Sequence, residues 1–155
     1  MIMNMVYENI LVAIDGSKEA EWAFRKAVSI AKRNHAHLML CTIIDSREVV
    51  LTSYGLPIEP AFIEHAENFS HSLLTKYKNT AIENGLSNVE TIIEYGSPKV
   101  KIAKEIAPEK NVDLIVCGAT GMNAVERIFV GSVSEHILRY ANCDVLIVRT
   151  EKEED

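Results

Sequence analysis

One stretch near the C-terminal end of the chain has the residue types of an anion site. It runs from Gly118 to Glu135 and reads GATGMNAVERIFVGSVSE. Ser132 and Glu135 predict a capping box that begins a helix, so Gly131 and Ser132 stand at a helix N-terminus, where backbone N–H groups attract anions. Gly118 and Gly121 would let the backbone approach a ligand closely. A lone GxxG or SxxE is also typical of ordinary turns and caps, and the Ser132 hydroxyl suits either the cap or a phosphate.

A second turn could take part in the same chemistry. Asp15, Gly16 and Ser17 follow the first apolar run of the chain, and Gly118 follows the fourth. Ligands of open parallel sheets bind outside the carboxyl ends of the strands, where the strand order reverses. If the first and fourth strands are neighbours there, both turns face one crevice.

The elements that position these turns alternate regularly along the chain. Four runs are almost continuously apolar, as strands covered on both faces must be, whereas 89–93 alternates more and is predicted to be an edge strand. The five predicted strands are 9–14, 38–44, 89–93, 112–117 and 145–148.

Helical patterns lie between the predicted strands. One apolar face is formed by Ala20, Ala23, Phe24, Ala27 and Ala31, and a second by Phe62, Ala66, Phe69, Leu73 and Tyr77 before Asn84-Gly85 ends that helix. Ser97 and Pro98 predict the N-cap and first position of a third helix. We therefore predict an α/β fold: a single doubly wound, flavodoxin-like or Rossmann-like domain over residues 1–150, with a five-stranded parallel sheet in the order 3-2-1-4-5 and helices on both faces.

Composition narrows the function further. A formal net charge of -6 without a basic cluster argues against a nucleic-acid surface. No stretch approaches the roughly 20 apolar residues of a membrane span, and the start lacks the features of a signal peptide, so we expect a cytoplasmic protein. Cys41, Cys117 and Cys143 lack a CxxC spacing and are expected to be reduced core thiols. The acidic end, 151–155, is predicted to be a disordered tail.

Other phosphate-binding and metal-binding patterns are missing from the sequence. Neither GxxxxGK[ST] nor a GxGxxG after the first strand is present, which argues against P-loop and dinucleotide-binding enzymes. A receiver domain would need an aspartate at the end of the third strand, which here ends Glu94-Tyr95-Gly96. His35 and His37 share a strand face, but no third ligand type accompanies them, so we predict no metal ligands in the chain.

The combined spacing of Gly118, Gly121, Gly131 and Ser132 is more specific than its parts. It resembles the nucleotide-binding signature of the universal stress protein family, in its ATP-binding branch. The resemblance extends over most of the chain, through the segments NILVAIDGS, YGSPKVKIAKEI, VDLIVCGATG and VGSVSEHILRYANCDVLIVR and the order of the elements.

The resemblance implies a bound ATP, with Mg²⁺, and a role for individual residues. Asp15 would lie against the adenosine and the backbone of Ile43 against the adenine edge; Gly118 and Gly121 would flank ribose and phosphates; Gly131, Ser132 and the N–H of Val133 would hold the β and γ phosphates. The complete predicted set is Asp15, Gly16, Ser17, Ile43, Gly118, Thr120, Gly121, Arg127, Gly131, Ser132 and Val133.

The resemblance also implies a homodimer built through the last strand. Two departures bear on these implications. Asp144 stands where the family often has proline before that strand, and Ala119-Thr120 lack the basic or histidine side chain frequently seen between the two glycines. Arg127 is either the cation of this loop or a solvent-facing side chain. The segment 46–59 is either a flap over the nucleotide or disordered.

These observations favour a stress-response or signalling module that binds nucleotide over an enzyme that turns it over. No evident general base stands near the predicted phosphates, since Thr120 and Ser132 are poor bases and Glu126 lies in an unconstrained loop, so we assign no catalytic residue. Two alternatives remain. One is a slow ATPase or phosphotransferase, and the other is a dimerisation module without nucleotide. No motif in the sequence identifies the protein partners or the inducing stress.

Overall fold

Five parallel strands form one sheet in the order β3-β2-β1-β4-β5, as the sequence predicted. The computed structural model describes residues 5–45, 60–119 and 130–150. The strands are β1 (Asn9–Ala13), β2 (His37–Asp45), β3 (Val89–Gly96), β4 (Leu114–Gly118) and β5 (Asp144–Val148). The helical segments are α1 (Lys18–Asn34), α3 (Pro60–Glu83), α4 (Pro98–Val100), η1 (Lys101–Ile106), α5 (Ala107–Glu109) and α6 (Ser132–Tyr140).

The apolar character of the central strands follows from burial on both faces. Ile10 and Val12 of β1 pack into one core, while Leu11 between them packs into another, and all three are fully buried. In contrast, β3 lies at the edge and includes half-buried and exposed residues, which confirms its predicted position. The alternation in VETII therefore reports a strand that is only partly covered.

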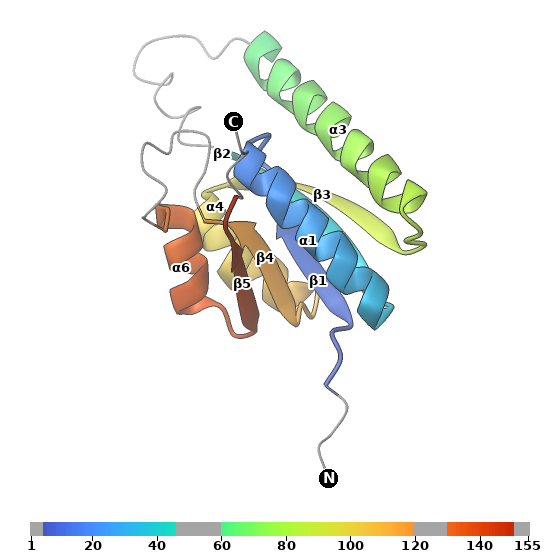
Figure 1. The fold of residues 1–155 in the computed structure, drawn as a ribbon. Coiled ribbons are helices and arrows are strands. Elements are labelled where there is room, and N and C mark those ends of the chain that lie inside the picture. The colour runs from blue at the N-terminus through green and yellow to red at the C-terminus, as the bar shows by residue number, and fades with distance from the viewer. Residues whose placement is uncertain (1–4, 46–59, 120–129, 151–155) are drawn as a thin grey trace, which may run out of the picture.

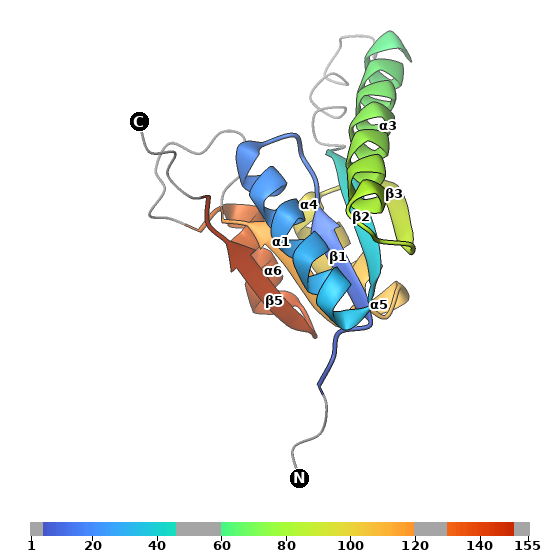
Figure 2. The ribbon, with the colours of Figure 1, turned by 45° about the vertical axis from the view of Figure 1, so that its right-hand side comes forward.

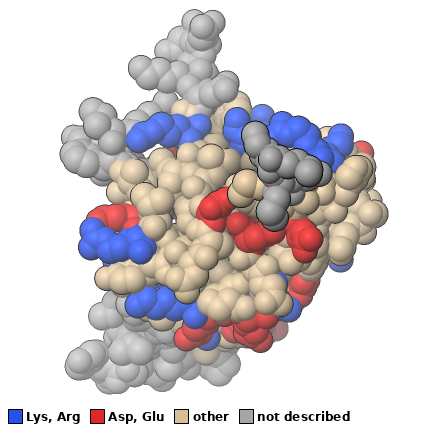
Figure 3. Space-filling view, turned by 90° about the horizontal axis from the view of Figure 1, so that it is seen from below, with Lys and Arg blue, Asp and Glu red and all other residues tan. Residues whose placement is uncertain are grey.

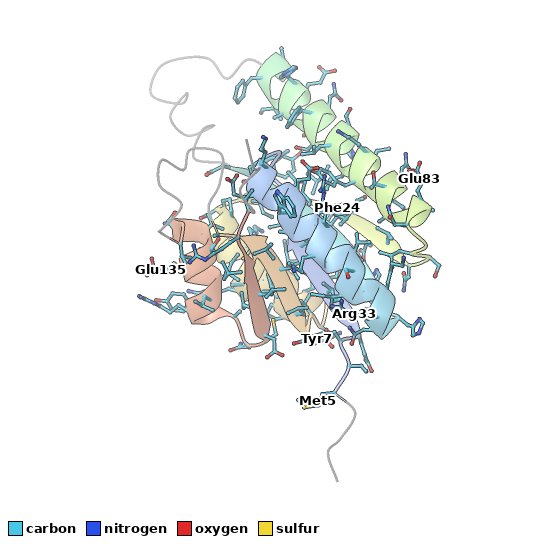
Figure 4. The ribbon with its side chains drawn as sticks, viewed as in Figure 1. Met5, Tyr7, Phe24, Arg33, Glu83 and Glu135 are labelled. Carbon is cyan, nitrogen blue, oxygen red and sulfur yellow. The ribbon has the colours of Figure 1, made fainter. Side chains whose placement is uncertain are left out.

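The helices cover the sheet in two layers (Figures 1 and 2). On one face α1 and α3 pack against the first core, and Phe24 of α1 lies between the two helices (Figure 4), with its ring centroid 4.6 Å from that of Tyr77. On the other face η1, α5 and α6 pack against the second core through residues such as Ile102, Ala107 and Ile137. The predicted doubly wound arrangement is confirmed.

The predicted apolar face of α1 is correct, but that of α3 is only partly so. Phe62 and Phe69 were expected in the core and are instead 50% and 58% exposed. The first half of α3 extends past the end of the sheet in Figure 1, so apolar side chains there have no strand to pack on. Further along, the buried positions are Ser70, Leu74 and Ala81, one residue out of phase with Phe69 and Leu73.

The helix that follows β3 has an unusual centre. It begins at Ser97 and Pro98 as predicted, although the Ser97 side chain makes no capping hydrogen bond. Residues Lys101–Ile106 form a wider π-helical turn before α-helical geometry resumes in α5. Within this helix Ile102, Ala103 and Ile106 are buried against the sheet, so the wide turn still presents an apolar face to the core.

At the amino edge of the sheet, carboxylates accept hydrogen bonds from the segment that leads into β1. Asp113 accepts hydrogen bonds from the backbone N–H groups of Glu8 and Asn9, at 2.8 and 2.9 Å, and Tyr7 donates its hydroxyl to Asp144 at 2.7 Å. Viewed from below in Figure 3, Asp and Glu side chains gather near the middle of this face. Parallel sheets bind ligands at the opposite, carboxyl edge, so that edge is the one to examine. No helix within the described ranges is long and apolar enough to cross a membrane.

Candidate functional site

The carboxyl ends of β1 and β4 lie side by side at the centre of the sheet. β1 pairs with β2 on one side and with β4 on the other. From β1 the chain adds β2 and β3 toward one edge of the sheet and then returns to add β4 and β5 toward the other edge, so the strand order reverses between β1 and β4. The turn at Asp15 follows β1, and β4 ends at Gly118, with Ala119 directly after it. The two turns that the sequence singled out therefore meet at the switch point of the sheet, where doubly wound folds bind ligands.

The first turn is held by its own side chains. Asp15 Oδ1 accepts hydrogen bonds from the Ser17 backbone N–H at 2.9 Å and from Ser17 Oγ at 2.5 Å. Ser17 Oγ in turn accepts from the Ala20 N–H at 3.1 Å and caps α1. Gly16 between them has φ +86°, which favours glycine. The hydroxyl of the buried Ser17 therefore already takes part in the turn and in the helix cap. Asp15 is exposed and uses only one of its two carboxylate oxygens in the turn.

The second turn brings the end of β4 to the start of α6. The Gly131 N–H donates to the Ala119 carbonyl at 2.6 Å, and the Ser134 hydroxyl donates to the Gly118 carbonyl at 2.5 Å. Ala119 also donates its N–H to Val148 of β5 at 3.0 Å. Two predicted site residues, Gly118 and Gly131, are therefore neighbours. Thr120, Gly121 and Arg127 lie outside the described residues, and so does the segment 46–59, for which the sequence left a flap and a disordered segment open.

The start of α6 differs from the predicted capping box. Gly131 is the N-cap and Ser132 the first helical residue, and no side chain of the described residues is seen to cap the helix. Glu135 pairs with Arg139 at 3.1 Å on the outer side of α6 (Figure 4) and does not reach back. The prediction was wrong because Ser134, not Ser132, is the buried serine of this turn. As a result, the Ser132 hydroxyl is exposed and is not used by the cap.

The free backbone N–H groups at the start of α6 begin one residue later than the sequence predicted. We expected a free N–H at Gly131, but that group bonds to Ala119. The first intrahelical bond runs from the Glu135 N–H to the Gly131 carbonyl at 2.9 Å. Helical geometry therefore leaves the N–H groups of Ser132, Val133 and Ser134 without an intrahelical acceptor. Together with the positive end of the helix dipole, they form an anion-attracting group.

Gly118 has a packing role that the sequence did not reveal. A Cβ atom at this position would lie 2.8 Å from Glu19 Cβ and 2.9 Å from the Glu19 backbone carbon and oxygen. These distances are far below van der Waals contact, so α1 can pack on β4 only when residue 118 is glycine. The requirement for glycine here arises from helix–strand packing, whatever ligand the edge binds.

Ile43 lies at the same edge of the sheet. Cys41 of β2 accepts a hydrogen bond from the Ile14 N–H at 2.7 Å, and the Thr42 hydroxyl donates to the Ile14 carbonyl at 2.9 Å. Ile43 is the next residue along β2, so its backbone lies beside the Asp15 turn, while its half-buried side chain packs against the second core. This position is compatible with the predicted contact of the Ile43 backbone with a bound base.

A group of cations around His136 of α6 was missed by the sequence analysis. The ring of His136 packs against that of Tyr140 with centroids 4.5 Å apart and a tilt of 42°, and its buried Nε2 atom has no hydrogen-bond partner among the described residues. Burial lowers the pKa of His136 from its usual value, and the nearby charges of Lys104, Lys99 and Arg139 lower that pKa further. The side chain is thus neutral at physiological pH. The separation in sequence between Lys99 and α6 left no signal of this proximity.

The cysteines and the remaining histidines show no sign of binding chemistry. All three cysteines are free thiols, as predicted, and burial raises the pKa of Cys41 to about 12 and that of Cys117 to about 11. His37 lies 3.4 Å from a Glu90 oxygen. Within the described ranges no group of three or more His, Cys, Asp or Glu side chains could hold a metal ion.

Known proteins are similar to this chain in both sequence and fold. The model of the Universal stress protein family matches residues 6–149. A universal stress protein of Staphylococcus haemolyticus is 55% identical over 148 residues, which span 96% of this chain and 88% of that protein. Universal stress protein UspA from Lactobacillus plantarum has 31% identity and a TM-score of 0.69, over 94% of this chain and 100% of that one.

Other solved structures share the fold at lower identity. The hypothetical protein MJ0577 superposes with a TM-score of 0.83 at 26% identity, over 96% of this chain and 100% of that one. A universal stress protein in complex with cAMP has a TM-score of 0.69 at 24% identity, over 95% and 100% of the two chains. The one from Archaeoglobus fulgidus in complex with dAMP has a TM-score of 0.63 at 23% identity, over 92% and 98%. On its sequence, its relatives and its fold, the chain belongs to the universal stress protein family.

Proposed function

We propose that this chain binds ATP, with Mg²⁺, at the carboxyl edge of its sheet. In this proposal it acts in the cytoplasm as a homodimeric stress-response or signalling module that holds nucleotide and does not turn it over rapidly. The observation that carries the proposal is the hydrogen bond between Gly131 and Ala119. It places the positive end of α6 beside the end of β4, next to the Asp15 turn, so that one ligand can reach all three.

The phosphates are assigned to the start of α6. The N–H groups of Ser132, Val133 and Ser134 lack intrahelical acceptors, and the exposed Ser132 hydroxyl adds a further donor. Mg²⁺ would be held mainly by the phosphates, because this ion keeps several waters and needs few protein ligands. The acidic groups seen from below in Figure 3 lie at the amino edge, at the other end of the strands from the proposed phosphates.

The adenosine is assigned to the Asp15 turn and the end of β2. Asp15 is exposed, and the oxygen that its turn does not use can accept a hydrogen bond from a ribose hydroxyl. The backbone of Ile43 lies next to this turn and offers polar groups to a base edge. Structural neighbours in complex with cAMP and with dAMP support an adenine nucleotide as the class of ligand.

Nucleotide binding has a direct thermodynamic signature. Titration of millimolar ATP and Mg²⁺ is expected to give measurable heat and to raise the thermal midpoint, since a ligand at 100 times its Kd stabilises the folded state by about 2.7 kcal/mol. Phosphate release should stay well below about one turnover per second, the lower end of ordinary enzymes. Neither heat nor stabilisation at millimolar ATP would refute the proposal, and rapid phosphate release would favour the ATPase alternative.

The dimer is proposed to form through β5. This strand pairs with β4 on one side, and its central residues Val145, Leu146 and Ile147 are only half buried. The Val148 carbonyl bonds to Ala119, so Val148 and Leu146 direct their backbone groups to β4. Because the two backbone groups of a residue point to the same side of a strand, the N–H groups of Val145 and Ile147 face the outer edge.

This alternation makes a test of the dimer possible. Sedimentation at tens of micromolar is expected to give the mass of two chains, and Ile147→Pro should give one, because proline removes an outward donor while sparing the ladder to β4. Leu146→Pro is the matched control and should lower stability, since it removes a donor to β4. A wild-type protein that sediments as one chain, or an Ile147→Pro variant that remains a dimer, would contradict the proposed interface.

A further inference from the structure

The helix that follows β3 begins at the edge of the sheet that carries the proposed site. β3 ends at Gly96, which pairs with Asp45 at the end of β2, and Ser97 and Pro98 start α4 immediately afterwards. α4 packs against α6, and Figures 1 and 2 both show it beside the first part of α6. The second residue of α4 is Lys99, which is half buried.

Contacts further along the two helices fix their relative register. The Lys104 amino group lies 4.4 Å from the centre of the Tyr140 ring, at the C-terminal end of α6. Both helices run away from the carboxyl edge, because both connect parallel strands. Lys99 precedes Lys104 by five residues and therefore lies nearer to the start of α6, in agreement with its electrostatic effect on His136.

The charge of this region is not balanced within the described chain. Lys101 pairs with Glu105 at 2.7 Å, Lys110 with Glu90 at 2.9 Å and Arg139 with Glu135 at 3.1 Å, but no carboxylate pairs with Lys99 in the described ranges. Among the described residues the charged groups that act on His136 are cations, and none of these residues forms a hydrogen bond with its buried Nε2 atom. A cation that lacks a carboxylate partner and lies near the positive end of a helix dipole favours an anion.

We propose that Lys99 is the side chain that supplies a cation to the phosphates bound at the start of α6. This inference rests on the proposed function and deepens it. The residues between Gly118 and Gly121 are Ala119 and Thr120, which carry no charge, and Arg127 further along this loop lies outside the described residues. Lys99 provides a cation from α4, which packs against α6. Its flexible stem and ammonium group are typical of a phosphate-binding lysine.

The test compares two neutralised lysines of the same helix. Lys99→Gln is expected to weaken ATP binding about tenfold, because the free energy of such a contact should lie between that of a buried charged hydrogen bond and that of an exposed ion pair. The affinity for adenosine, which has no phosphate, should not change. Lys104→Gln removes the same charge five residues further from the edge and should change ATP affinity less than about twofold, as expected for a distant exposed charge. Lys99→Arg keeps the cation and should retain most of the affinity. All four proteins are titrated calorimetrically with ATP and with adenosine at one ionic strength.

The outcomes separate this inference from the function on which it rests. If wild-type protein binds neither ATP nor adenosine, the proposed function fails and the inference falls with it. If wild type binds ATP and Lys99→Gln binds it equally well, Lys99 does not contact the phosphates and only the inference is overturned. Equal losses in the two glutamine variants, or a parallel loss of adenosine affinity in Lys99→Gln, would likewise overturn it, because they indicate a general field or a distorted site.

Discussion

Gly131→Val is expected to reduce ATP affinity by at least about 100-fold, which corresponds to about 2.7 kcal/mol, while the fold stays intact. A branched side chain at the N-cap of α6 would occupy space beside the N–H groups that the phosphates need. The backbone at this position does not require glycine, because φ is -65° and ψ is 163°, which valine adopts readily. The variant should therefore damage the binding site and spare the backbone. Calorimetry with ATP and a circular dichroism spectrum measure both effects.

Ser132→Ala is the control for that experiment. Because Ser132 is the first helical residue and not the cap, its removal should change the free energy of unfolding by less than about 0.5 kcal/mol. Loss of a hydroxyl contact to phosphate should lower the binding free energy by about 1 kcal/mol. If Gly131→Val binds ATP as tightly as wild type with an unchanged spectrum, the phosphates lie elsewhere.

Gly118→Ala is expected to lower the free energy of unfolding by about 3 kcal/mol, because overpacking against backbone cannot be relieved by a rotamer change. The added methyl would lie 2.9 Å from the backbone of Glu19, so α1 would have to move away from β4. Urea unfolding followed by circular dichroism measures the loss. The expected displacement of α1 also moves Ser17 and the Asp15 turn, so ATP affinity should fall in parallel.

A glycine elsewhere in the chain provides the comparison. Gly85 has φ +100°, and the nearest atom to an added Cβ is a flexible lysine carbon at 3.8 Å. Gly85→Ala therefore introduces backbone strain without a clash and should cost about 1 to 2 kcal/mol. A Gly118→Ala variant as stable as wild type would show that α1 and β4 can separate at little cost, contrary to the packing described here.

The sequence predicted the architecture well because the relevant signals are local. Runs of apolar residues such as LVAI and LIVC report burial on both faces of a strand, and the polar positions of VETII report an edge. The same reasoning failed for Phe62 and Phe69, since periodicity shows which residues share a helix face but not where the sheet beneath that helix ends. The spatial extent of a neighbouring element is not a local property.

The candidate site was predicted in outline and was wrong in detail. The meeting of Asp15 with the end of β4 follows from strand order, which the crossover rule makes predictable. The choice between Ser132 and Ser134 does not, because both fit a helix start and only burial against Gly118 selects the second. Lys99 belongs to another helix, and its proximity to α6 depends on the packing of two elements more than thirty residues apart.

The contact between Gly118 and Glu19 bears on how chains of this fold diverge. A descendant that lost its nucleotide would still require glycine at 118, because the requirement comes from the packing of α1 and not from the ligand. Position 131, with a backbone that any residue can adopt, would be released at once to accept larger side chains. In a comparison of such chains, glycine at 118 therefore indicates only that the fold is kept. Glycine at 131 indicates that the position is still constrained by a bound ligand.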